Sequence, residues 1–266
     1  MTARVLIATD LDRTLIYSAA AAERPVTALM PVERYRGQEI SYMTVTAADR
    51  FADLAAEHVV VPVTTRTPEQ LARVRLPGPP PRWAVAANGG VLLADGEPDP
   101  DWAERVQAAV GAVKPLDAAV TELSAVCDHA WSAAPRIAAD LFCYVVVDRT
   151  AMPGDVVERL QAWAEPAGWA VSLQGRKLYL VPTPLTKSAA VAEVARRAGT
   201  GRTLAAGDSL LDIDLLAAAD RGVRPGHGEI AESGWSAPHV EGLTATGADA
   251  GEEIVAWFAA ASGMVR

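Results

Sequence analysis

Short apolar runs alternate with segments of helical spacing along the first third of the chain. The runs at 4–9 and 59–63 are continuously apolar, which is typical of strands buried on both faces of a parallel sheet. Thr67 followed by Pro68 and an acidic residue indicates the start of a helix. We therefore predict strands at 4–9, 59–63 and 83–87, helices at 47–57 and from residue 68, and an irregular Pro/Gly loop at 77–81.

The middle of the chain loses this rhythm, which returns after Pro184. Residues 141–147 are rich in β-branched and aromatic side chains, which favour a strand. Gln174-Gly-Arg176 lies between two β-prone runs, as in a hairpin. The middle is predicted to contain helices at 101–113, 117–126 and 152–164 and strands at 141–147, 169–173 and 177–181. The last part is predicted to contain helices at 187–198, 210–219 and 254–261 and strands at 202–206 and from Val223.

This order of elements predicts an α/β protein with an inserted domain. The core would be a Rossmann-like parallel sheet with helices, built from residues 1–92 and 183–266. An α+β domain of residues 93–182 would interrupt it.

Composition narrows the class of protein. The 266 residues carry 24 basic and 33 acidic side chains, a net charge of −9, which argues against a nucleic-acid or anionic-membrane partner. The two cysteines form no CxxC pair, which excludes a disulfide scaffold or a thiolate zinc site. The apolar stretch before Asp10 is too short for a signal peptide, and no run reaches the length of a membrane span. We expect a soluble cytoplasmic protein, with its oligomeric state left open.

Polar side chains follow three predicted strands, at the sheet edge where ligands bind in open α/β folds. The side chains there are carboxylates, hydroxyls, one Arg and one Lys, without His or Cys. This set excludes a Ser–His or Cys–His triad and favours Mg²⁺ with a phosphate. The residues are Asp10, Asp12 and Thr14 after the first strand, Thr64 and Arg66 after the second, and Asp208 and Asp212 after the last, with Lys187 opening the preceding helix.

The spacing of Asp10 and Asp12 suits phosphoryl transfer. Residues two apart on an extended chain lie on one side, so both carboxylates can reach one substrate. Asp10 can attack phosphorus to give an aspartyl-phosphate, while Asp12 protonates the leaving oxygen and then activates water. Asp208 and Asp10 would hold Mg²⁺. Thr64 would donate a hydrogen bond to the phosphate, and Lys187 would offset the negative charge.

Four segments resemble, in the right order, the motifs of the haloacid dehalogenase (HAD) superfamily of phosphatases. Two further features resemble the subgroup of this superfamily that carries a type C2 cap: Asn88-Gly89 after the third strand, and an insert between the second and third motifs. That subgroup includes Cof-type, sucrose-phosphate and mannosyl-3-phosphoglycerate phosphatases. The matching segments are Asp10-Leu-Asp12-Arg-Thr14 (DxDxT), Val63-Thr64-Thr-Arg66, Thr186-Lys187-Ser188 and Gly207-Asp208-Ser-Leu-Leu-Asp212 (GDxxxD).

The resemblance implies roles for these positions, and it also shows where this sequence departs from the family's usual motifs. Asp12 is similar to the acid/base of the phosphatases, which dehalogenases lack. Arg13 and Thr65 stand where Gly is usual, and Leu211 stands where Asn is frequent. The string from Leu11 to Ser18 also resembles the HAD proteins encoded with tellurium-resistance genes.

We therefore expect a Mg²⁺-dependent phosphatase acting on a small phosphorylated metabolite, with a sugar phosphate or phosphoglycerate favoured by analogy. A phosphatase for nucleotide-like phosphates in a stress-linked pathway, and a low-turnover phosphate-binding regulatory module, are the alternatives. The expected site has Asp10, Asp12, Thr64 and Lys187 as catalytic residues, Arg13, Thr14, Thr65, Arg66, Asn88 and Gly89 as substrate contacts, and Asp10, Asp12, Asp208 and Asp212 as metal ligands.

Several further residues have two interpretations. Arg34-Tyr-Arg36 is either a plain exposed loop or a flap that faces the substrate, and His227 belongs either to an ordinary loop or to the edge of the site. Asp214 is interpreted as an exposed or supporting helix residue. Specificity would come from a pool in the insert: Arg136, Tyr144, Arg149, Arg176, Lys177 and Tyr179.

Overall fold

The computed structural model describes residues 4–264 and divides into two compact units. The core unit comprises Met1–Pro98 and Lys187–Arg266, and the inserted unit comprises Asp99–Thr186. Within residues 4–264, no helix is both long enough and apolar enough to cross a membrane.

A five-stranded parallel sheet forms the centre of the core unit, as the continuous apolar runs predict. The strand order is β14-β13-β12-β1-β4. Every residue of β1 is buried, because helices cover both faces of the sheet. The strands are β1 (Leu6–Thr9), β4 (Val59–Pro62), β12 (Thr203–Ala206), β13 (Arg221–Arg224) and β14 (Val240–Gly242).

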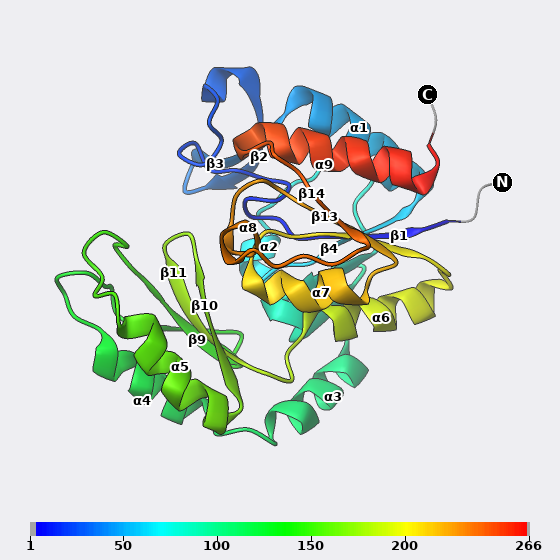
Figure 1. Ribbon diagram of the computed structural model, residues 1–266. Helices are drawn as coiled ribbons and strands as arrows, with labels where there is room; N and C mark the ends of the chain where they lie inside the picture. The colour runs from blue at the N-terminus through cyan, green and yellow to red at the C-terminus, as the bar shows by residue number, and fades with distance from the viewer. Residues whose placement is uncertain (1–3, 265–266) are drawn as a thin grey trace. The chain divides into compact units, whose positions relative to one another are not determined.

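Two pairs of helices cover the core sheet (Figure 1). On one face lie α1 (Val45–Glu57), capped by Thr44, and α9 (Gly247–Ser262). On the other face lie α6 (Lys187–Ala198) and α7 (Ile213–Ala218). Apolar side chains such as Phe51, Leu54 and Phe258 pack into the core. The unit also contains η1 (Val26–Ala28), α2 (Pro68–Leu71), η2 (Ala87–Gly89), η3 (Leu210–Asp212) and α8 (Glu229–Ser233).

Two small antiparallel sheets complete the core unit. A hairpin of β2 (Leu29–Tyr35) and β3 (Gln38–Thr44) turns at Arg36 and Gly37, both with positive φ, as tight hairpin turns require. The second is a meander of β5 (Trp83–Ala86), β6 (Val91–Ala94) and β7 (Glu97–Pro98). A parallel bridge between Val63 and Val85 joins this meander to the end of β4.

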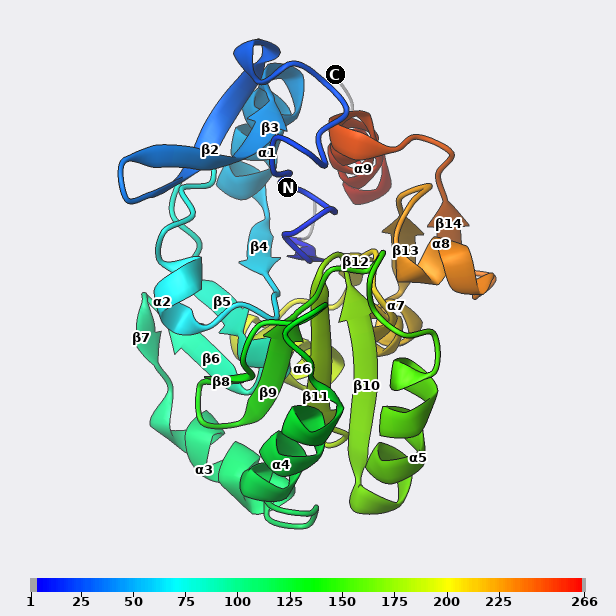
Figure 2. The same cartoon turned by 90° about the vertical axis from the view of Figure 1, so that its left-hand side faces the viewer.

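The inserted unit is an antiparallel sheet with helices on one face (Figure 2). Its strand order is β10-β11-β9-β8, and α4 and α5 pack on β9 and β10. Burial, and to a lesser extent the nearby Cys127 thiol at the end of α4, raise the pKa of Cys143 of β9, which places Cys143 on the helix side of the sheet. The elements are α3 (Pro100–Val110), α4 (Leu116–Val126), β8 (Arg136–Ala138), β9 (Phe142–Val146), α5 (Val156–Ala167), β10 (Trp169–Gln174) and β11 (Lys177–Pro182).

The fold class predicted from the sequence is confirmed, with corrections to individual elements. The hairpin at 29–44 was not predicted: the sequence indicates no regular structure there, and Arg34-Tyr-Arg36 is in fact its tip rather than a plain loop. β6, β7, β8, β14 and α8 were also missed. The last helix begins at Gly247 rather than at Ile254, because its first turns are rich in small residues that carry little periodic signal.

Candidate active site

Asp10 and Asp208 emerge side by side because their strands are parallel neighbours. Thr9, the last residue of β1, pairs with Ala206, the last residue of β12. The chain continues from these two residues into Asp10 and into Gly207-Asp208. Both carboxylates are thereby brought to the carboxyl edge of the core sheet, where the sequence predicts the site.

Lys187 joins the two acidic segments. Its ammonium group donates to Oδ1 of Asp10 at 2.6 Å and to Oδ1 of Asp212 at 2.5 Å, and its side chain has no exposed surface. Burial alone lowers the pKa of Lys187, but the two carboxylates outweigh it and the net shift is upward. The lysine is therefore a permanent positive charge inside the site.

Burial raises the pKa of Asp10 to about 7, against the opposing effect of Lys187 and with a further rise from Asp212. Burial, then Asp10 and Asp212, also raise the pKa of Asp208 well above its usual range. Crowded carboxylates in a buried site favour the protonated form unless a cation neutralises them.

Asp212 organises the turn that carries Asp208. Its Oδ2 accepts hydrogen bonds from the backbone N–H groups of Asp208 (3.2 Å) and Ser209 (2.9 Å) and from the Ser209 hydroxyl (2.7 Å). A Cβ on Gly207 would overlap the Asp212 side chain, and a Cβ on Gly228 would overlap Asp208. Glycine at these two positions lets the acidic residues approach so closely.

The residues present fit a divalent cation. Asp10, Asp208 and Asp212, all buried, each offer an oxygen, and these atoms lie within 4.8 Å of one another. Carboxylate oxygens are the ligands that Mg²⁺ prefers. The Asp12 carboxylate is not part of this group; it points to Arg66 instead.

Asp12 forms a two-pronged ion pair with Arg66. Nε and Nη2 of Arg66 donate to the two carboxylate oxygens of Asp12, each at 2.7 Å. The Asp12 side chain is about half exposed (49%), whereas that of Arg66 is 9% exposed. The Nε and Nη2 groups of Arg66, which the sequence predicts to contact the substrate, thus bind the predicted acid/base Asp12 instead.

The predicted phosphate-binding residues lie in two hydrogen-bonded loops. Thr64 is buried, and its hydroxyl accepts from the backbone N–H of Arg66 at 3.2 Å. The Asn88 N–H donates to the Thr64 carbonyl at 2.9 Å, and Asn88 and Gly89 both have positive φ. These bonds place Thr64, Asn88 and Gly89 together, with Thr65 half-buried between Thr64 and Arg66.

Arg13 and Thr14 border the acidic group. Nε of Arg13 lies 3.4 Å from Oδ2 of Asp208, and the Thr14 hydroxyl donates to Oδ1 of Asp208 at 3.4 Å. Arg13 has a φ of 64°, a left-handed conformation that glycine adopts without steric cost. This explains why glycine is usual at this position in the motif that the sequence resembles.

His227 reaches this edge of the site, which the sequence left open. Its Nε2 lies 2.7 Å from the Arg13 carbonyl oxygen, and its ring packs edge-on against Tyr17. Burial lowers the pKa of His227. The sequence signal for this position of His227 was that it follows the strand that becomes β13 (Arg221–Arg224), at the same sheet edge as the acidic residues.

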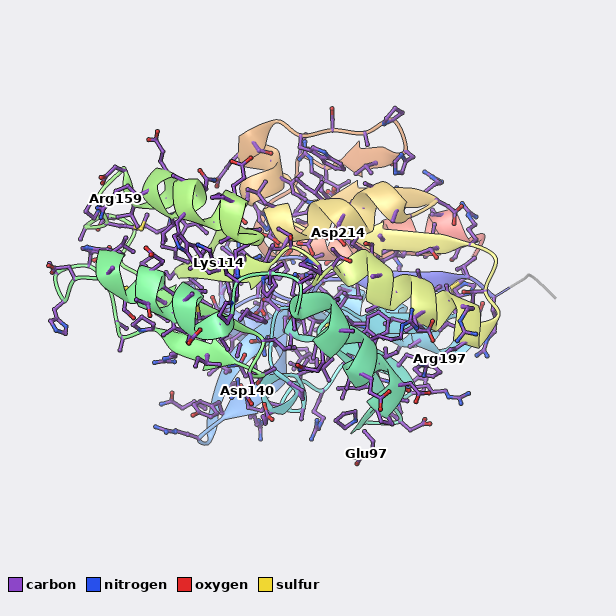
Figure 3. The ribbon with its side chains drawn as sticks, turned by 90° about the horizontal axis from the view of Figure 1, so that it is seen from below. Glu97, Lys114, Asp140, Arg159, Arg197 and Asp214 are labelled. Carbon is purple, nitrogen blue, oxygen red and sulfur yellow. The ribbon has the colours of Figure 1, made fainter. Side chains whose placement is uncertain are left out.

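Asp214 supports the site from outside. It lies on α7, facing α6 (Figure 3), and its Oδ2 accepts from the backbone N–H of Ser188 at 2.8 Å. A carboxylate at the start of a helix stabilises its free N–H groups. Asp214 therefore anchors the first turn of α6, next to Lys187.

Solved structures share this fold at low sequence identity. The sucrose-phosphatase of Synechocystis sp. PCC6803, in complex with sucrose and phosphate, is 18% identical and has a TM-score of 0.63, with 97% of this chain and 98% of that chain covered. A HAD subclass IIB sugar phosphatase is 12% identical, with a TM-score of 0.60 and coverage of 98% and 100%. The C-terminal domain of C. albicans trehalose-6-phosphate phosphatase is 12% identical, with a TM-score of 0.56 and coverage of 100% and 94%.

No protein-family model and no curated protein matches the sequence. The structural neighbours show that the chain has the fold of HAD superfamily phosphatases, core and inserted unit included. The resemblance seen in the four sequence motifs is confirmed at the level of the fold.

Proposed function

We propose that the chain is a phosphohydrolase that cleaves the phosphate ester of a small, sugar-like metabolite with Mg²⁺ as cofactor. The observation that carries the proposal is the buried group of Asp10, Asp208, Asp212 and Lys187 at the carboxyl edge of the core sheet. Three carboxylates and one lysine carry a net negative charge, which is costly to bury; a bound cation would offset it, and the cation would in turn attract a phosphate. The sugar-phosphate class is supported by the names of the structural neighbours.

Asp10 is the proposed nucleophile. Its carboxylate oxygen forms a bond to phosphorus while the bond from phosphorus to the leaving oxygen breaks, which gives an aspartyl-phosphate. Lys187 binds Oδ1 of Asp10, which fixes the carboxylate and offsets the charge of the phosphoryl oxygens.

Asp12 is the proposed general acid and base. Its carboxyl proton passes to the leaving oxygen in the first step. The resulting carboxylate then takes a proton from the water that attacks phosphorus, and inorganic phosphate and free Asp10 are released. Thr64, with the N–H groups of its loop, is proposed to bind the phosphoryl oxygens.

Asp10, Asp208 and Asp212 are proposed to hold the Mg²⁺ ion. When bound, the ion neutralises the phosphoryl charge and favours the ionised form of the carboxylates. The raised pKa values of Asp10 and Asp208 are consistent with a site built for a cation.

The inserted unit is proposed to act as the cap that selects the substrate. Alternation along β9 places Tyr144 on the face opposite Cys143 and therefore away from the helices. Tyr144 pairs with Tyr179 across the sheet, with ring centroids 5.4 Å apart, and the Lys177 ammonium lies 5.5 Å from the Tyr144 ring centre. Aromatic rings beside a cation suit a hydroxylated, anionic ligand.

Hydrolysis of 4-nitrophenyl phosphate tests the proposal. We expect activity with Mg²⁺ that EDTA removes, and a loss of about a thousandfold or more in Asp10→Asn. Asp49→Asn, which changes an exposed acid on α1, is the matched control and should retain full activity. Equal activity in wild type and Asp10→Asn would sink the nucleophile assignment.

A screen of phosphate esters tests the substrate class. Disaccharide and monosaccharide phosphates should give higher kcat/KM than phosphoglycerate or nucleotide monophosphates. A preference for nucleotides would overturn the sugar assignment. The absence of turnover, with phosphate still bound, would favour a regulatory phosphate-binding module.

A further inference from the structure

The hairpin β2–β3 brings a buried carboxylate against Arg66. Glu33 lies on β2, and its side chain has no exposed surface. Its Oε2 lies 2.9 Å from Nη1 of Arg66 and accepts from the Ser41 hydroxyl at 2.6 Å, while Oε1 accepts from Nε of Arg73 at 3.1 Å. A buried carboxylate is kept only where such partners compensate for the loss of water.

Arg66 therefore lies between two carboxylates that use different parts of its guanidinium group. Nε and Nη2 bind Asp12, and Nη1 binds Glu33. Burial by itself lowers the pKa of Arg66, but Asp12 and Glu33 outweigh it, so the group stays charged. Because guanidinium is planar and rigid, a partner on Nη1 fixes the direction in which the Nε–Nη2 edge points.

We propose that Glu33 is a positioning residue: by binding Nη1 it fixes the plane of Arg66 and shares the guanidinium charge with Asp12, so that Asp12 is held in the orientation that proton transfer to the leaving oxygen requires and can still take up the proton that it transfers. The hairpin is then part of the active site, although none of its residues takes part in the reaction. This inference rests on the proposed function, because it assigns a role through Asp12 in that reaction.

The geometry gives this role a specific kinetic signature. A misdirected Asp12 slows the step in which the leaving oxygen needs a proton. An ester with a good leaving group needs no proton, so it escapes the loss. A change that only loosens the fold, or that removes a phosphate contact of Arg66, slows all esters alike.

The experiment compares two aryl phosphates with Mg²⁺. Phenyl phosphate releases a phenol with a pKa of about 10, whereas 2,4-dinitrophenyl phosphate releases a phenolate that needs no proton. We expect Glu33→Gln to lower kcat/KM for phenyl phosphate at least about tenfold more than for the dinitrophenyl ester. Asp12→Asn should show the same selectivity, with a larger loss.

Glu39→Gln is the matched control. Glu39 lies on the same hairpin and pairs with Arg34 at 2.6 Å, but both side chains are exposed, so both esters should be hydrolysed at the wild-type rate. If Glu33→Gln does not fold, Glu33→Asp is the second variant. It keeps the negative charge, but its shorter side chain moves the carboxylate away from Arg66, so it should show the same larger loss on phenyl phosphate than on the dinitrophenyl ester. Equal losses on the two esters overturn the role of Glu33 alone. A wild-type chain that hydrolyses neither ester overturns the proposed function as well.

Discussion

The ammonium group of Lys187 lies 2.5 Å from Oδ1 of Asp212, and neither side chain has any exposed surface. The same ammonium binds Asp10, so one lysine compensates two buried carboxylates, one directly after β1 and the other in η3, which follows β12. Removal of one partner of a buried ion pair leaves the other charge without compensation.

Lys187→Met is therefore expected to abolish activity and to destabilise the chain by about 3–5 kcal/mol. The double variant Lys187→Met/Asp212→Asn should regain part of this stability but no activity. Urea unfolding and 4-nitrophenyl phosphate hydrolysis measure the two effects. Lys114→Met, at an exposed position, is the control. A stable, active Lys187→Met variant would contradict the assigned role.

Asp208→Asn is expected to stabilise the metal-free chain at neutral pH. The pKa of Asp208 is raised, first by burial, so the folded chain holds this proton more tightly than the unfolded chain does. The folded state therefore loses stability as the pH rises above the ordinary carboxyl range, because Asp208 ionises more readily in the unfolded chain. Asparagine cannot ionise, so the Asp208→Asn variant does not lose this stability.

Thermal unfolding in EDTA at pH 8 should give Asp208→Asn a higher Tm than the wild type, by about 2–4 °C for each kcal/mol. The difference should shrink towards pH 4. Added Mg²⁺ should raise the Tm of the wild type and leave that of the variant unchanged. A lower Tm for Asp208→Asn at pH 8 would contradict the claim that burial and the neighbouring carboxylates make the ionised Asp208 side chain destabilising.

Arg13→Gly is expected to reduce the Mg²⁺ concentration needed for activity, by up to about fivefold. The arginine has a positive φ, and its guanidinium pairs with Asp208, so it competes with a cation for that carboxylate. The pair is partly exposed and is worth no more than about 1 kcal/mol. Titration of activity with Mg²⁺ measures the change, and a higher Mg²⁺ requirement would instead indicate that Arg13 supports the site.

Local sequence signals were sufficient for the elements that carry the main site. Thr67 caps the helix that its position before Pro68 predicts, and α6 begins at Lys187 and ends at Ala198, as the sequence predicts. The apolar runs that become β1 and β12 end just before Asp10 and Asp208. The acidic group was predictable because the carboxyl ends of parallel strands share one edge.

The hairpin and its link to Asp12 were not predictable in the same way. Pro31 and the inward-pointing Glu33 interrupt the apolar pattern of β2, so that it does not resemble a strand. The partner of Glu33 lies 33 residues further along, at Arg66. Nothing in the local sequence of either residue shows that contact, which exists only after the chain has folded.

His58 is expected to make stability depend on pH in the direction opposite to Asp208. Within residues 4–264, neither of its buried ring nitrogens has a hydrogen-bond partner. Burial lowers its pKa, so below pH 6.5 the unfolded chain binds a proton that the folded chain resists. Stability is therefore present above that pH and lost as the pH falls, by at most about 1.4 kcal/mol per pH unit. His58→Leu should remove this slope between pH 7 and 5 in urea unfolding, whereas His129→Leu, at an exposed position, should not. An unchanged slope in His58→Leu would show that another group titrates between pH 7 and 5. Activity should be retained in this variant, because His58 precedes β4 and so lies at the edge of the sheet opposite the acidic group.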